Sequence, residues 1–178
     1  VAIVITSAAR LNNRYVLGDS IDVTVTFTEA VVVTGSPKMS VTIGGQTRDF
    51  EYLNQPTASS VKFRYTVVSG DNGSVLLTAN SLSLSGLASI IDPAGNDAVL
   101  THALPFQSAS PEVDTTVATV SMGRWSAFQT ERAIDVDLVF SEDVSGLTAG
   151  DLELSGSANN CTLTVNGATR VWRMSIQC

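Results

Sequence analysis

Hydrophobic and polar residues alternate along much of this chain, and one alternating stretch occurs twice. Residues 21–31 are matched 113 positions later by residues 134–144, with Ile, Asp, Val, Phe, Glu and Val at the same places. Alternation of this period predicts a strand that is buried on one face. A repeat at this spacing is about one domain long, so the chain is predicted to hold two units of one kind, over 1–114 and 115–178.

Other stretches carry the same strand period. The alternation at 61–67 predicts a strand whose aromatic side chains fill a core. Gly44-Gly45 predicts a hairpin turn between strands at 39–43 and 48–53. Helical periodicity is missing from every segment of ten or more residues. Many short strands separated by turn signals predict an all-β fold built from antiparallel β-sandwiches.

Several short motifs follow one another in the first unit: Tyr15, Gly18-Asp19, 27–31, 33–37, 63–67, 92–96 and 113–116. Their order resembles one bacterial Ig-like (cadherin-like) repeat of large surface adhesins and biofilm-associated proteins. In the second unit, 145–154 resembles a segment of another bacterial Ig-like subtype.

The resemblance implies an extracellular structural or adhesive module, without catalytic residues and commonly associated with calcium. The fold class expected from it is two tandem antiparallel Ig-like β-sandwich domains. The partners it implies are neighbouring Ig-like repeats of the same chain or neighbouring subunits. The expected role is to extend a bacterial cell-surface adhesin.

The second unit is shorter than the first. Residue 178 corresponds to Tyr65 at the repeat spacing, so nothing in the second unit corresponds to 66–114. An incomplete sandwich exposes strand edges and apolar surface to water. Two explanations remain open: the intact protein continues past Cys178, or another chain supplies a strand by β-augmentation, as in a self-assembling pilus-like fibre.

The two cysteines lie at the ends of a predicted hairpin in the second unit. Its strands, at 161–165 and 172–178, begin and end on Cys161 and Cys178, with Asn166-Gly167 as the expected turn. In an extracellular protein this placement predicts a disulfide between them. The alternative is a pair of buried reduced thiols, since cysteine is often a small core residue.

The charge balance changes the choice of partners. Ten basic and seventeen acidic residues give a net charge of −7, which argues against nucleic acid and anionic membranes. No apolar run reaches the roughly 18 residues that span a bilayer, so no membrane insertion is expected in this segment. The carboxylates either form a solvated surface or bind a hard cation such as calcium.

Calcium is the inorganic ligand that the acidic loops favour. The oxygen-bearing candidates lie in turns, at a strand end and at the junction between the units, although turn chemistry alone also favours Asp, Asn and Gly in loops. The predicted ligands are Glu29, Asp71, Asp92, Asn96 and Asp114.

No enzymatic activity is predicted. Motifs of serine hydrolases, zinc peptidases and phosphate-binding loops are missing from the sequence. The only histidine, His102, adjoins no nucleophile or carboxylate motif and is expected to be a surface or edge residue.

Overall fold

The computed structural model describes residues 1–103, 110–123, 133–155 and 161–177. These residues form strands, turns and two short 3-10 helices, and no α-helix occurs among them. The predicted all-β class is confirmed. The chain divides into two compact units, Val1–Thr116 and Val117–Cys178, two residues beyond the predicted boundary. Within the described ranges, no helix is long and apolar enough to cross a membrane.

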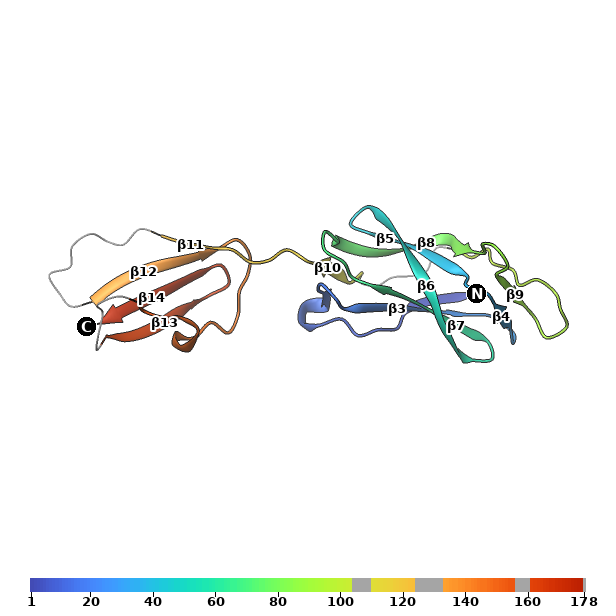
Figure 1. Ribbon diagram of the computed structural model, residues 1–178, viewed down its shortest axis with the longest axis horizontal. Coiled ribbons are helices and arrows are strands. Elements are labelled where there is room, and N and C mark those ends of the chain that lie inside the picture. Colours follow the sequence, from blue (N-terminus) through green and yellow to red (C-terminus); the bar gives the residue numbers. More distant parts are fainter. Residues whose placement is uncertain (104–109, 124–132, 156–160, 178) are drawn as a thin grey trace. The chain divides into compact units, whose positions relative to one another are not determined.

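An eight-stranded sheet with the order β1-β3-β7-β6-β5-β8-β10-β2 makes up most of the first unit (Figure 1). A separate two-stranded sheet pairs β4 with β9. The strands are β1 (Ala2–Ile5), β2 (Arg14–Tyr15), β3 (Ser20–Thr26), β4 (Val32–Thr34), β5 (Lys38–Ile43), β6 (Gln46–Thr57), β7 (Ser60–Thr66), β8 (Asn72–Ser83), β9 (Ser89–Ile91) and β10 (Glu112–Asp114), with the 3-10 helix η1 at Leu11–Asn13.

One pair of neighbouring strands departs from the antiparallel prediction. Strand β10 pairs with β2 in parallel and with β8 in antiparallel orientation. The Arg14 side chain on β2 lies 3.5 Å from a carboxylate oxygen of Glu112 and 3.2 Å from one of Asp114, both on β10. These ion pairs hold the two short strands side by side. Strand β10 therefore has a neighbour on each side.

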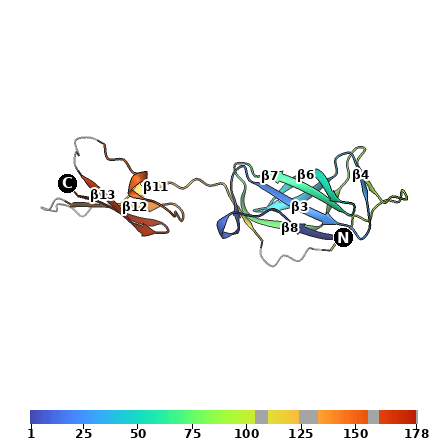
Figure 2. The ribbon, with the colours of Figure 1, turned by 90° about the horizontal axis from the view of Figure 1, so that it is seen from below.

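A single hydrophobic core fills the first unit, because the large sheet curls around it. Strands β7 and β8 lie on opposite sides of this unit in both views (Figures 1 and 2). Alternate residues of the repeated strand, Ile21, Val23 and Val25, are fully buried, as their alternation predicts. The predicted aromatic filling of the core is confirmed by Phe63, which is also fully buried. The largest other fully buried side chains of the core are Tyr15, Phe50, Met39, Ile43 and Ile90.

The hairpin predicted at Gly44-Gly45 joins β5 to β6, with Ile43 opposite Gln46. Both glycines have positive φ angles, 53° and 85°, a region that side chains with a Cβ rarely adopt. At Gly44 the neighbouring backbone is also very close, since an added Cβ would lie 1.7 Å from the carbonyl oxygen of Asn72. Glycine is therefore required at Gly44 by both conformation and space.

The second unit repeats half of this sheet. Its strands β11 (Val120–Met122), β12 (Ala133–Phe140), β13 (Thr162–Ala168) and β14 (Val171–Gln177) form one sheet with the order β11-β12-β14-β13, and η2 spans Ala149–Asp151. The second copy of the repeated stretch, β12, lies between the antiparallel strands β11 and β14, as β3 lies between the antiparallel strands β1 and β7. Its core consists of Val136, Leu138, Trp172 and Met174.

The turn between β13 and β14 was predicted at Asn166-Gly167, and this prediction is wrong. Both residues lie inside β13, opposite Arg173 and Trp172. The chain instead reverses at Thr169 and Arg170, with Thr169 at φ 56°. Gly167 is needed within the strand because an added Cβ would lie 2.5 Å from Cα of Trp172 and 3.0 Å from its ring.

Candidate functional site

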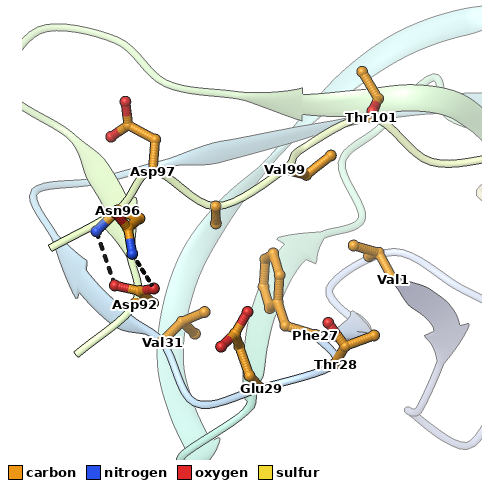
Figure 3. Close-up of a pocket in the computed structure, with 11 residues that line it drawn as sticks. Val1, Phe27, Thr28, Glu29, Val31, Asp92, Asn96, Asp97, Val99 and Thr101 are labelled. Carbon is orange, nitrogen blue, oxygen red and sulfur yellow. Dashed lines mark hydrogen bonds between the residues drawn. The ribbon is translucent and has the colours of Figure 1, made fainter. Parts of the chain in front are cut away.

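An open pocket of about 380 Å³ lies beside the two-stranded β4–β9 sheet of the first unit (Figure 3). One wall is the segment that follows β3, and the other is the segment that follows β9. The residues that line the pocket are Val1, Phe27, Thr28, Glu29, Val31, Asp92, Asn96, Asp97, Ala98, Val99 and Thr101.

The wall after β3 is held by backbone hydrogen bonds. The amides of Phe27 and Val31 donate to the carbonyl oxygens of Ser59 and Ala58, each at 2.8 Å. The Gln55 side-chain amide also donates to the Val31 carbonyl, at 2.7 Å. Phe27 and Val31 are buried and supply apolar surface, while Glu29 between them is exposed.

The other wall is a turn closed by its own side chains. The Asp92 carboxylate accepts from the Asn96 amide at 2.8 Å and from the Asn96 side-chain nitrogen at 2.7 Å (Figure 3). These bonds lower the pKa of Asp92, so it is charged at neutral pH. Gly95, at φ 94°, completes the turn. The oxygens of Asp92 therefore serve local turn structure.

Three acidic residues, Glu29, Asp92 and Asp97, are among the residues that line the pocket, and no lysine, arginine or histidine is among its described lining residues. The pocket thus combines negative charge with apolar contact. Within the described ranges, no group of three or more His, Cys, Asp and Glu side chains is placed to hold a metal ion.

The five predicted calcium ligands fall into two groups at opposite ends of the first unit. Glu29, Asp92 and Asn96 line the pocket beside β4 and β9. Asp71 immediately precedes β8, and Asp114 ends β10, at the other end (Figure 1). The structure therefore does not assemble the five residues into one site.

Asp71 is committed to protein donors. Its side chain has no exposed surface, and one oxygen lies 2.8 Å from both Nε and a terminal nitrogen of Arg48. The other oxygen accepts from the Tyr65 hydroxyl at 2.7 Å and from the Val68 amide at 3.0 Å. Burial alone would raise the pKa of Asp71, but the bonds from Tyr65, Val68 and Arg48 outweigh burial and lower it. Asp71 is a charged residue neutralised by a guanidinium. Both of its carboxylate oxygens already have protein partners, which does not fit a role as a calcium ligand.

Asp114 is likewise engaged. One of its oxygens pairs with Arg14 at 3.2 Å, and the other accepts from the Thr116 amide at 3.1 Å. Arginine thus stands beside each carboxylate predicted to bind calcium near the junction. Sequence reasoning missed Arg48 as a partner of Asp71 because Arg48 lies 23 residues away along the chain. It missed Tyr65 because the aromatic side chains of that strand were expected to fill the core.

Calcium removal is expected to leave the melting temperature of the chain unchanged. The predicted ligands near the junction are held by arginines, and Asp92 is held by Asn96. Thermal melts with calcium and with a chelator measure this directly. A rise in melting temperature that saturates with calcium would contradict the expectation and point to the pocket carboxylates.

Alkaline pH is expected to destabilise the first unit through Tyr65. Burial, with the hydrogen bond to Asp71, raises the pKa of Tyr65 from 10.0 to about 12. The unfolded chain then loses this proton at a lower pH than the folded chain, so the stabilisation is complete below pH 10 and is lost as pH rises toward 12. We expect the free energy of unfolding, measured in urea at each pH, to fall more steeply with pH for the natural chain than for Tyr65→Phe. The same dependence on pH in both proteins would show that Tyr65 does not carry the effect.

Cys161 is disulfide-bonded, whereas Cys178 lies outside the described residues. The chain has no third cysteine, so the predicted pair remains the expected one. We expect a non-reducing digest to release the peptides around both cysteines as one linked species, which separates after reduction. Recovery of a dimer joined through Cys161 would contradict an intrachain bond.

His102 is a buried residue, contrary to the expected surface or edge position. Its Nε2 accepts from the Ser81 amide at 3.0 Å, and its own amide donates to the Asn80 side chain at 2.9 Å. His102 thereby ties the segment after β9 to β8. These contacts give His102 a structural role that no local sequence motif predicts.

Comparison with known proteins finds no matching family model, no matching curated protein and no matching solved structure.

Proposed function

We propose that this chain is a pair of tandem Ig-like β-sandwich units that serve as a structural spacer in an extracellular bacterial surface protein. The observation that carries the proposal is the repeated strand order, β1-β3-β7-β6 in the first unit and β11-β12-β14-β13 in the second. Units of one kind joined in one chain are the building principle of repeat arrays, whose length is set by the number of units.

The packing of each unit supports a structural role. Each has its own hydrophobic cluster, so each contributes its own folding energy. The pocket of the first unit offers carboxylates and apolar contact, and its described lining residues include no serine, cysteine, lysine or histidine. The neighbours proposed for these units are further Ig-like repeats.

An extracellular location is supported by the bonded state of Cys161. Disulfides persist in oxidising compartments and are rare in the bacterial cytosol. The net charge of −7 keeps such a surface soluble and repels anionic membranes and nucleic acids.

The alternative is a subunit of a self-assembling extracellular fibre, completed by a strand from its neighbour. One observation favours it: among the described strands, β13 pairs only with β14 and so leaves one edge open. The placement of β1 does not suit a strand donated to a neighbouring subunit, because β1 pairs with β3 and Ile3 is buried in the core of the first unit. We therefore favour the spacer.

Two experiments test the proposal. Light scattering of the full chain should give the monomer mass of 18.7 kDa at all concentrations, whereas a fibre subunit would polymerise. If the chain is a spacer, deletion of 1–5 should lower the stability of the first unit. If it is a fibre subunit that donates this strand, the deletion should abolish polymerisation. Antibodies against the chain should label intact source cells, and labelling only after lysis would overturn the extracellular spacer.

A further inference from the structure

The chain leaves the first unit through a residue that is tied to the loop between β7 and β8. The Thr115 hydroxyl donates to the Asp71 carbonyl oxygen at 3.0 Å and accepts from the Gly70 amide at 3.1 Å. The Thr115 amide donates to the side-chain oxygen of Asn72 at 2.8 Å. Backbone and side chain of Thr115 are thus both held by three consecutive residues.

The loop that holds Thr115 is itself fixed from inside the unit. The Asp71 carboxylate has no exposed surface and contacts Arg48 on β6, Tyr65 on β7 and the Val68 amide. The Tyr65 ring in turn stacks on Phe50, with ring centres 5.2 Å apart. Phe50 is fully buried in the core. An unbroken series of contacts therefore runs from Thr115 to the centre of the first unit.

We propose that Thr115, Asn72, Asp71 and Arg48 form a metal-free anchor that fixes the point where the chain leaves the first unit. Arg48 supplies the positive charge that a calcium ion would otherwise supply to Asp71. The anchor goes beyond the spacer function and holds whether or not the chain is a spacer. Tension on the chain beyond Thr116 acts on Thr116, whose hydroxyl also donates to Asn72, and then on Thr115. It is passed to β6 and β7 because the Asp71 side chain contacts Arg48 and Tyr65 on these strands.

Amide hydrogen exchange in the full chain tests the anchor residue by residue. Thr115→Val removes the acceptor of the Gly70 amide, and Asn72→Ala removes the acceptor of the Thr115 amide. Each variant should speed exchange of that one amide about tenfold, the scale of one lost hydrogen bond and its local opening. Thr78→Val, at an exposed position of β8, is the matched control and should change neither amide.

The remaining measurements decide between the anchor and its alternatives. The Val23 and Val25 amides of β3 report the core, and they should exchange as slowly in both variants as in the natural chain. Equal acceleration of these core amides would overturn a local anchor. In the natural chain, adding a chelator should leave the Gly70 and Thr115 amides unchanged, and acceleration by the chelator would overturn the metal-free anchor. Unchanged exchange of Gly70 in Thr115→Val would overturn it too.

Discussion

Substitution of Gly44 by alanine is expected to destabilise the first unit by about 2–5 kcal/mol. Two costs add at this position. The backbone φ of 53° is left-handed, which costs an alanine about 1–2 kcal/mol. The new Cβ would also lie 1.7 Å from the Asn72 carbonyl oxygen, so the β5–β6 turn and the start of β8 must move apart. Overpacking of this kind costs about 1–3 kcal/mol more.

Gly45 is the matched control, since it is the next residue of the same turn. Its φ is 85°, yet an added Cβ meets nothing within 4 Å. Gly45→Ala should therefore cost only the conformational part, about 1–2 kcal/mol. Urea unfolding followed by the fluorescence of a probe in the first unit measures both variants. Equal losses for Gly44→Ala and Gly45→Ala would show that the contact with Asn72 does not matter.

Asp71→Ala is expected to destabilise the first unit by about 3 kcal/mol. The substitution leaves the Arg48 guanidinium, the Tyr65 hydroxyl and the Val68 amide without their acceptor. Arg48 is partly exposed and recovers some hydration, which keeps the loss at the lower end for a broken buried pair. The pKa of Asp71 is lowered by its partners, so its contribution is present above pH 3.8 and is lost as pH falls further.

Asp49→Ala provides the comparison on the same hairpin. Asp49 is adjacent to Arg48, its side chain is 53% exposed, and its ion pair with Lys38 spans 3.6 Å. Exposed pairs contribute roughly 0–1 kcal/mol, so this variant should unfold close to the natural chain. Chemical denaturation at neutral pH measures the difference between the two. A loss below about 1 kcal/mol in Asp71→Ala would contradict the proposed importance of the buried carboxylate.

Local pattern was sufficient to predict the strands that line the core. Alternation at 21–27 and 61–67 places Val23 and Phe63 on one face, and both are fully buried. The Gly44-Gly45 turn was also predictable, because the conformation it needs is a property of the turn itself. A strand that is buried on one face carries its period in its own residues, so no knowledge of its neighbours is needed.

Contacts between distant residues were not predictable in this way. The loop of Asp71 has the composition of a calcium-binding loop or of an ordinary turn, and only the arrival of Arg48 from β6 decides how the carboxylate is used. His102 is similar, because its acceptor role depends on Ser81, 21 residues away. Such pairings are set by the curvature of the sheet, which a single strand does not encode.

The misplaced turn in the second unit has a related cause. Asn-Gly is a strong hairpin signal because both residues tolerate positive φ. In this chain Gly167 is instead used for packing, because it lies against Trp172 inside the sheet. The turn is formed two residues later, at Thr169. A glycine that serves packing and one that serves a turn look the same in sequence.

The first and last strands of the first unit, β1 and β10, differ in the number of strands that pair with them. Among the strands that the structure describes, β1 lies at the margin of the large sheet and pairs only with β3, whereas β10 lies between β8 and β2. A margin strand separates after one row of hydrogen bonds opens, but an enclosed strand must break two rows. Fraying of this unit, and digestion by proteases that need a loosened segment, should therefore begin at its amino-terminal side.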